Sequence, residues 1–502
     1  VTGLAVLVPV AGRADPLAHP LALGLLAGAC ALPFWSTPEV IVDASRYFCQ
    51  AKALATSGWR AFWSGWGGPI FAWTDLPLTG LLNGLVFRLL GEERLGMQGL
   101  NTAFLAGTVL CTSRLGRTLW DAETGFLAGL LVLACPFLCS QVPLLLADVP
   151  AMFFFTLAVG GWISALATGG AARIVLAGLG IAGAVLAKFS TWPMLSTLVV
   201  AAAVLGPNRH WRQAGRGLGA LAVAGLLLAP AAVALWPVLR EQLPFLASYQ
   251  RPGLTRWTES PVSTLLFQTH PLLVTAALAG LARGVRRRER RLLIPLCPLL
   301  ILAGLAVQRS RYSLPCLPML ALVAGYGLRG LAEVPLRRFL ALGAAWSALV
   351  TGRLAFVPFL AATSAGNLEP AGHYLDHLGV SQAQVVTLPA EGLVLDSRVA
   401  LPLLDLHTRV PLLHWPTPQP QPDPETLAAA PLRFTWEMPL PDLYQRPADP
   451  SGTAALVVIR GWAGQPLPPA VADLAATYPQ AAAFDADSGA FTAKTLITVY
   501  HH

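Results

Sequence analysis

The feature that most constrains this chain is a series of apolar runs that fills its first 358 residues. An α-helix needs roughly 20 apolar residues to cross the hydrocarbon core of a bilayer. The sequence predicts about eleven such spans, which are expected near 17–35, 95–113, 123–140, 150–167, 172–188, 191–206, 217–239, 263–282, 292–308, 312–331 and 338–358. We therefore expect a polytopic α-helical membrane protein.

Composition supports this class of protein. Only 12% of the residues are charged and 55% are hydrophobic, whereas a soluble domain carries roughly 25% charged residues. The net charge of +8 could suggest a nucleic-acid partner, but the basic residues lie in short clusters between apolar runs. Nucleic-acid binding needs a continuous basic face. The sequence thus indicates membrane lipids, and no nucleic acid, as partners.

The arginine clusters predict the orientation in the membrane. With Arg13 and the N-terminus in the cytoplasm, every strong arginine cluster falls on the cytoplasmic side, as the positive-inside rule requires. This count treats the apolar stretch 76–90, which Arg88 interrupts, as an interfacial helix in a first external loop at 36–94. We expect a multi-pass protein of the bacterial inner membrane whose C-terminal part is periplasmic or extracellular.

The composition of the sequence changes after about residue 359, where charged residues, prolines and short β-prone runs appear. The expected elements are strands at 384–388, 455–461 and 495–500 and helices at 370–378 and 469–478. The sequence therefore predicts a transmembrane domain at 1–358 and a small extracytoplasmic α/β domain at 359–502.

Two carboxylates stand at the predicted outer ends of spans. Asp43 follows the first span and precedes Arg46 and Tyr47, and Asp148 follows the third span. A charge at a membrane boundary suggests a functional role. The alternative is that each only caps a helix, since Asp148 lies just before Pro150.

Three cations are expected at the same face. Lys188 ends a span, and Arg309 and Arg311 lie in an external loop. Such cations can bind a phosphate, although Lys188 could simply extend to the lipid headgroups and the arginines could form salt bridges. Because they outnumber the carboxylates at their own span ends, we expect them to converge on one phosphate.

The histidines give a weaker signal. His270 lies within a predicted span, where it is either a neutral hydrogen-bonded side chain or a ligand. His373 and His377 are four residues apart but lack the glutamate of a zinc-protease motif, which favours a polar helix face. The sequence contains no clustered metal-ligand motif, so a metal ligand set stays unknown.

Several segments resemble the GT-C glycosyltransferases of the protein O-mannosyltransferase and aminoarabinose-transferase type (glycosyltransferase family 39-like). The motifs that carry this resemblance are Asp43-Ala-Ser-Arg46-Tyr47, TDLPLTGLLNGLVFRLLGEE (74–93), TSRLGRTLWDAETGFLAGLLVLACPF (112–137), LADVPAMFFFTLA (146–158), AGLGIAGAVLAKFS (177–190) and RYSLPCLPMLALVAGYGL (311–328). The chain departs from the family at Ala44, where a second acidic residue is common, and at Asp75, where a lysine is common.

The resemblance implies an inverting transfer of a sugar from a polyprenyl-phosphate donor to a hydroxyl of a lipid, glycan or protein acceptor. Asp43 would be the general base, and Asp148 would orient the acceptor or help to bind a metal. The donor phosphate would be bound by Lys188, Arg309 and Arg311, and the supporting residues would be Arg46, Tyr47, Asp75 and His270. No cofactor is certain, and a divalent metal stays open.

Two other functions fit parts of the sequence. The degenerate acidic motif at Asp43-Ala44 would also suit a non-catalytic GT-C-like scaffold subunit of a membrane complex. A secondary transporter would favour inverted repeats and ionisable residues at the membrane midplane, whereas the carboxylates here fall at one face.

Overall fold

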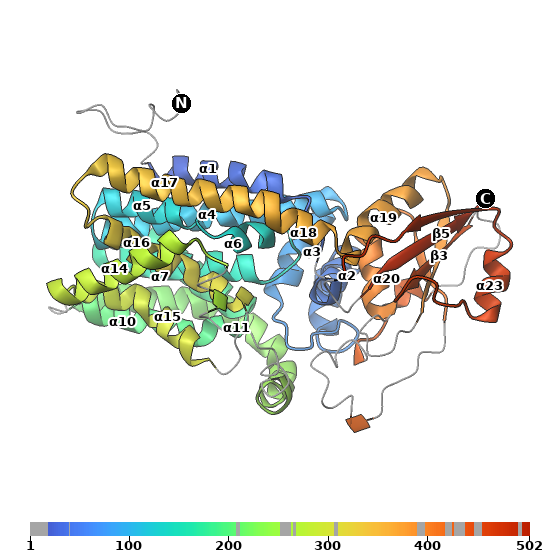
Figure 1. The fold of residues 1–502 in the computed structure, drawn as a ribbon. Helices are drawn as coiled ribbons and strands as arrows, with labels where there is room; N and C mark the ends of the chain where they lie inside the picture. Colours follow the sequence, from blue (N-terminus) through green and yellow to red (C-terminus); the bar gives the residue numbers. More distant parts are fainter. Residues whose placement is uncertain are drawn as a thin grey trace.

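The computed structural model describes residues 19–39, 41–206, 211–250, 263–264, 268–305, 310–388, 397–416, 424–425, 437–445, 454–489 and 494–502. Helices of the first 361 residues form an elongated bundle, and a β-sheet with its own helices lies beyond one end of it (Figure 1). Helices α2 (Ile41–Gly65) and α3 (Leu78–Leu90) lie between these two parts (Figure 1).

The remaining bundle helices follow the apolar runs closely. They are α1 (Pro20–Ala31), α4 (Arg94–Leu119), α5 (Ala122–Leu131), α6 (Pro136–Gln141), α7 (Asp148–Thr168), α8 (Ala171–Ala187), α9 (Thr191–Met194), α10 (Thr197–Leu205), α11 (Trp211–Phe245), α14 (Pro271–Arg287), α15 (Leu293–Gly304), α16 (Leu317–Leu328), α17 (Val334–Thr351) and α18 (Val357–Ala361). In the described part of the chain, three helical stretches are long and apolar enough to cross a membrane alone: Asp148–Thr168, Gln213–Ser248 and Val334–Ala361.

Some expected spans are not continuous helices in the structure. The run at 123–140 forms α5 and α6, because the chain turns before Pro136, which begins the second helix. The run at 191–206 likewise forms α9 and α10. The count of about eleven continuous spans therefore stays a prediction, although the helices occupy the expected runs.

Small residues allow close helix packing inside the bundle. A Cβ atom on Gly327 of α16 would lie 2.0 Å from the carbonyl oxygen of Ala276 in α14. A Cβ atom on Gly280 of α14 would lie 2.2 Å from the carbonyl oxygen of Val323. Backbones that approach this closely are typical of membrane helix interfaces.

The described residues of the C-terminal part form a five-stranded sheet in the order β2-β1-β3-β5-β4. Its strands are β1 (Gln382–Thr387), β2 (Leu412–His414), β3 (Ala454–Arg460), β4 (Gln480–Phe484) and β5 (Leu496–His501). Strand β1 is parallel to β2 and β3, whereas β5 is antiparallel to β3 and β4. The three predicted strands coincide with β1, β3 and β5, and the two predicted helices with α19 (Leu368–His377) and α23 (Pro469–Ala475).

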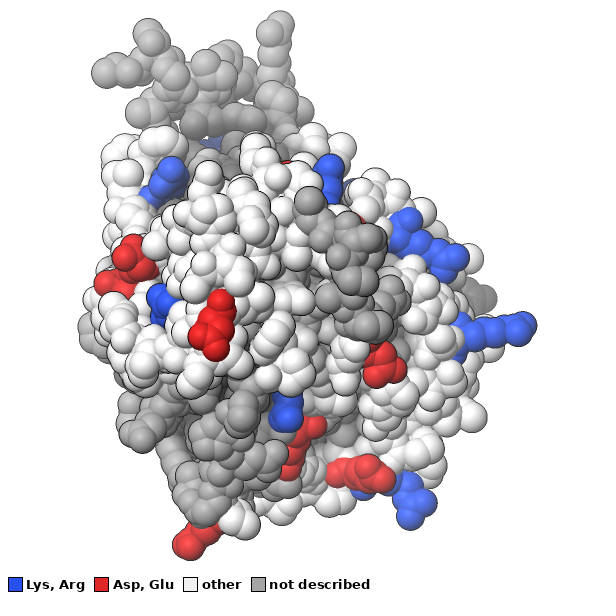
Figure 2. All heavy atoms as spheres, turned by 90° about the vertical axis from the view of Figure 1, so that its right-hand side faces the viewer, with Lys and Arg blue, Asp and Glu red and all other residues white. Residues whose placement is uncertain are grey.

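Helices cover both faces of this sheet. Apolar side chains of α19 and α20 (Ser397–Asp405) pack with one face, and those of α23 pack with the other. The end of the molecule that these elements form carries scattered charged side chains of both signs (Figure 2). Helices α11 and α17, by contrast, expose large apolar side chains such as Leu226, Val233 and Trp346. The bundle thus has surfaces suited to lipid, and the C-terminal part has a surface suited to water.

Candidate functional site

The first turns of α2 present a charged face. Asp43, Arg46 and Gln50 are three and four residues apart, so they lie on one side of the helix. The guanidinium of Arg46 donates to Oδ1 of Asp43 at 3.2 Å and, through Nε and Nη2, to both carboxylate oxygens of Asp75 at 2.8 and 3.0 Å. Arg46 and Asp75 are almost completely buried. A paired geometry of this kind fixes the orientation of the guanidinium.

The loop that carries Asp75 is held from two helices. Gln50 of α2 donates to Oδ2 of Asp75 at 3.2 Å and to the carbonyl oxygen of Phe71 at 3.1 Å. Gln242 of α11 donates to the carbonyl oxygens of Trp73 and Asp75 at 2.7 and 3.2 Å. Trp73 has a φ of 46°, which a bulky residue adopts only when its surroundings impose it. The position of Asp75 is therefore defined by tertiary contacts.

Two further ion pairs lie in the same network of charges. Arg311, in the 3₁₀ segment Ser310–Cys316, donates to Oδ2 of Asp43. Lys188 donates to Oδ1 of Asp148 at 2.5 Å, and its ammonium lies 4.2 Å from the ring centroid of Tyr312. The charge of Lys188 interacts with those of Arg311 and Asp43, and the charge of Arg311 interacts with that of Asp148.

Local structure explains why Lys188 reaches this position. Helix α8 ends at Ala187, and Lys188 has an extended backbone with φ of −161°. The hydroxyl of Thr191 contacts the carbonyl oxygens of Ala184 and Lys188 at 2.6 and 2.7 Å, which satisfies acceptors that the helix end leaves open. Asp148 is the first residue of α7. Both charged side chains therefore come from helix ends.

A second buried network supports the loop before Asp148. Glu39 accepts from Nε of Arg94 at 2.9 Å and from the backbone N–H of Leu145 at 3.0 Å. Asn101 donates to the carbonyl oxygen of Leu144 at 2.8 Å. These contacts tie the loop to α4 and to the segment after α1.

The structure thus brings together six of the predicted residues, which we name the charged cluster: Asp43, Arg46, Asp75, Asp148, Lys188 and Arg311. The cluster has three carboxylates and three cations. Lys188 and Arg311 lack carboxylates at their own span ends, as expected, but each meets a carboxylate from another element. The roles of these residues stay a prediction.

The other predicted residues have different surroundings. The placement of His270 inside a span is wrong, because α14 begins at Pro271 and His270 caps it by accepting from the backbone N–H of Leu272 at 3.1 Å. Tyr47 is buried in the apolar cluster that α2 shares with the C-terminal part. Arg309 lies outside the described residues.

Sequence reasoning missed the residues that support the cluster. Gln50 could have been found from its helical spacing to Asp43 and Arg46. Glu39 and Arg94 gave no comparable signal, because their pairing joins segments that are distant in the sequence.

The cluster does not fit a metal ion as it stands. Each of its three carboxylates contacts an arginine or a lysine, and a bound cation would have to displace these contacts. In the described part of the chain, no group of three or more His, Cys, Asp or Glu side chains is arranged to hold a metal. We therefore derive no step through a metal.

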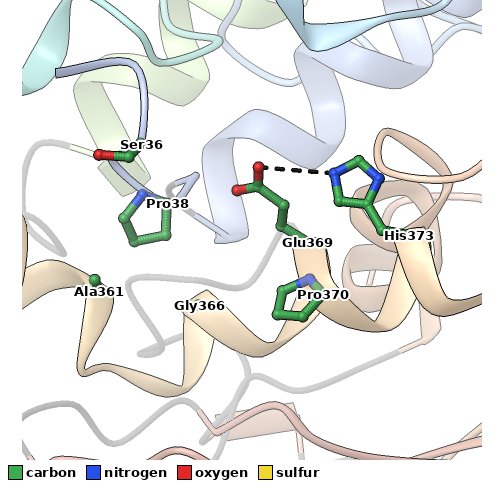
Figure 3. A pocket seen from close by; sticks show the side chains of 7 residues that line it. All are labelled: Ser36, Pro38, Ala361, Gly366, Glu369, Pro370 and His373. Atoms are coloured by element: carbon green, nitrogen blue, oxygen red, sulfur yellow. Dashed lines mark ion pairs between the residues drawn. The ribbon is translucent and has the colours of Figure 1, made fainter. Parts of the chain in front are cut away.

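A cavity of about 300 Å³ lies apart from the charged cluster. It is lined by Ser36, Pro38, Ala361, Gly366, Glu369, Pro370 and His373. Glu369 and His373 are neighbours on α19 at the same wall of the cavity, with 3.8 Å between Oε1 and Nε2 (Figure 3). None of the lining residues belongs to the charged cluster, so the cavity is not part of that site.

Comparison with known proteins identifies the fold. No protein-family model and no curated protein matches the chain. The structure of ArnT from Cupriavidus metallidurans bound to undecaprenyl phosphate aligns with a TM-score of 0.60 at 14% identity, covering 95% of this chain and 97% of that one. The apo state of the same protein aligns with a TM-score of 0.58, at the same identity and coverage.

The archaeal oligosaccharyltransferase AglB from Archaeoglobus fulgidus aligns less well, with a TM-score of 0.47 at 12% identity over 88% of this chain and 69% of that one. The two ArnT structures span nearly the whole chain, including its C-terminal part. The chain therefore shares its fold with the ArnT structures, as the resemblance in the sequence motifs predicted.

Proposed function

We propose that this chain is a membrane glycosyltransferase. It moves a sugar from a polyprenyl-phosphate donor to an acceptor hydroxyl at the outer face of the inner membrane, with inversion. The fold supports this proposal, and the matched ArnT structure is one that binds undecaprenyl phosphate. The C-terminal part then lies on the periplasmic side.

The observation that carries the proposal is the contact between Arg311 and Asp43 beside the contact between Lys188 and Asp148. A transfer of this kind needs a base beside the acceptor hydroxyl and a cation beside the leaving phosphate, on opposite sides of the anomeric carbon. The charged cluster contains both types of group within one network.

The proposed step is a single displacement. The acceptor oxygen attacks the anomeric carbon while Asp43 accepts the hydroxyl proton. The bond between the anomeric carbon and the phosphate oxygen breaks, and its electron pair stays on the polyprenyl phosphate. Arg311 and Lys188 stabilise the charge that grows on this leaving group. Inversion follows because the new bond forms on the face opposite to the bond that breaks.

Ion pairing suggests how donor binding prepares the base. Asp43 contacts both Arg46 and Arg311 in the structure. A donor phosphate competes for Arg311 and for Lys188. Asp43 would then have one cation fewer beside it and could contact the acceptor hydroxyl.

Purified protein in lipid nanodiscs, supplied with a panel of polyprenyl-phosphate sugars and candidate acceptors, tests the function. We expect release of polyprenyl phosphate that depends on an acceptor and on Asp43. Release that is the same for the wild type and for Asp43→Asn with every donor would contradict the proposal.

A scaffold role is the second candidate, and one observation favours it. Every carboxylate of the charged cluster is already engaged by a cation, which would also suit a purely structural network. The two roles differ in their response to the donor: a scaffold subunit either does not bind polyprenyl phosphate or binds it without releasing sugar.

A further inference from the structure

Helix α2 contacts both the apolar core of the C-terminal part and the charged cluster. Its residues Ala44, Tyr47, Phe48 and Ala51 recur at the spacing of one helical face, and they pack in the same apolar cluster as the sheet and helices of the C-terminal part. Its other face carries Asp43, Arg46 and Gln50 toward Asp75. The C-terminal part therefore contacts the helix that carries the proposed base.

Apolar packing alone does not fix such a helix. Hydrophobic contact is non-directional, and a shift of one residue along α2 moves a side chain by about 1.5 Å and turns it by about 100°. Directional polar contacts are the usual means of setting a register in a core. Arg46 and Gln50 provide such contacts near the start of α2, and a polar contact farther along would fix the helix at a second point.

Lys52 makes such a contact, about two and a half helical turns after Asp43. Its ammonium lies 2.6 Å from Oδ2 of Asp405, the last residue of α20, and 2.8 Å from Oε2 of Glu92, in the turn between α3 and α4. Tyr444 donates to the same oxygen of Asp405 at 2.5 Å. The side chains of Lys52 and Asp405 are only 14% and 7% exposed, so solvent screens this pair weakly.

We propose that Lys52 is a positioning residue for the transfer reaction. It locks α2 between Asp405 of the C-terminal part and Glu92 of the membrane part, and so sets the place of Asp43. This inference rests on the proposed function. It makes the C-terminal part a scaffold for the base.

The test compares Lys52→Met, Lys52→Arg and the double variant Lys52→Met/Asp405→Asn in the full-length protein in nanodiscs. The double variant avoids a buried unpaired carboxylate at Asp405 and keeps an acceptor for Tyr444. Because a misplacement near 1 Å can cost about a hundredfold in rate, we expect kcat to fall by about tenfold to a hundredfold in both methionine variants. Lys52→Arg should recover most of the rate.

Donor binding separates positioning from general damage. Arg311 and Lys188 lie on other elements, although Arg311 contacts Asp43, so the affinity for undecaprenyl phosphate should fall by a clearly smaller factor than kcat in the methionine variants. The matched control is Arg409→Ala. It removes an ion pair with Glu93 across the same interface, but in an exposed setting, where Arg409 is 82% exposed, and kcat should stay near the wild-type value.

Hydrogen exchange gives a readout that does not need turnover. Amide exchange in the first turns of α2 should increase in Lys52→Met and in the double variant, and stay unchanged in Arg409→Ala. If the wild type transfers no sugar but this exchange pattern holds, the proposed function fails while the locking of α2 stands. The positioning role is wrong if kcat and exchange are unchanged in the folded variants, or if kcat, donor binding and thermal stability fall together.

Discussion

Arg46 and Asp75 meet through two parallel hydrogen bonds, 2.8 and 3.0 Å long, and the remaining nitrogen of the same guanidinium contacts Asp43. Asp75 therefore acts on Asp43 through Arg46. The residue type at Asp75 is also a departure from the family that the sequence resembles, which commonly has a lysine nearby.

Asp75→Asn should lower the rate of transfer by about tenfold or more, because a neutral amide cannot hold Arg46 through two charge-assisted hydrogen bonds. The initial rate of polyprenyl phosphate release from the purified variant measures this. Thr74→Ala, one residue away, is the control and should keep a near-normal rate. Equal rates for the wild type and Asp75→Asn would remove Asp75 from the support of the site.

Asp43→Asn should lower transfer by at least about a hundredfold with near-normal expression, since general-base catalysis typically contributes about 10²–10⁴-fold. The substitution keeps the shape of the side chain and removes its basicity. Single-turnover measurement with bound donor isolates the chemical step from donor binding. Unchanged turnover would exclude Asp43 as the base.

Arg311→Ala or Lys188→Ala should weaken binding of polyprenyl phosphate by about tenfold to a hundredfold, because charge-assisted hydrogen bonds contribute roughly 1.5–3 kcal/mol each. Titration with a short and a long polyprenyl phosphate should show the same factor of weakening in Kd, because the cations contact the phosphate and not the prenyl chain. Arg114→Ala, an exposed cation of α4, serves as the control. A factor that changes with prenyl length would point to the chain-binding surface instead.

The sequence identified most of the charged cluster because ions at the ends of apolar runs are conspicuous. Asp43, Asp148, Lys188 and Arg311 each stand at such an end. Their pairing could not be predicted, since it depends on how each helix is rotated and packed. The pair Lys188–Asp148 joins residues 40 positions apart, and the pair Arg311–Asp43 joins residues 268 positions apart.

The limits of the prediction of the fold have similar physical causes. Hydropathy located the apolar runs, but it does not register a turn inside a run, such as the one before Pro136 that separates α5 from α6. Hydropathy also missed the role of α2. The apolar face of α2 is buried against the C-terminal part, which is encoded more than 300 residues later. Nothing in the sequence therefore indicates that Lys52 and Asp405 form an ion pair.

The predicted topology has its own test. Single cysteines at positions 287 and 420, placed in a variant without the native cysteines, should react with a membrane-impermeant reagent from opposite sides of the membrane. The arginine cluster around position 287 favours the cytoplasmic side. Labelling of both positions from the same side would overturn the span count.

Acid should destabilise the C-terminal part through His407. Burial, together with the charges of Arg94 and His373, lowers the pKa of His407 to about 3, whereas an unfolded histidine has a pKa of about 6.5. The unfolded chain thus binds the proton first. The stabilisation is fully present above about pH 6.5 and is lost as pH falls toward 3, by about 2 kcal/mol between pH 7 and pH 5.

His407→Leu cannot take up this proton, so its unfolding temperature should fall less between pH 7 and pH 5 than that of the wild type. The comparison uses the change with pH, so a constant loss of stability in the variant does not affect it. His377→Asn is the matched control, since His377 is an exposed histidine of α19, and it should keep the wild-type pH dependence. Parallel curves for the wild type and His407→Leu would show that His407 does not couple folding to pH.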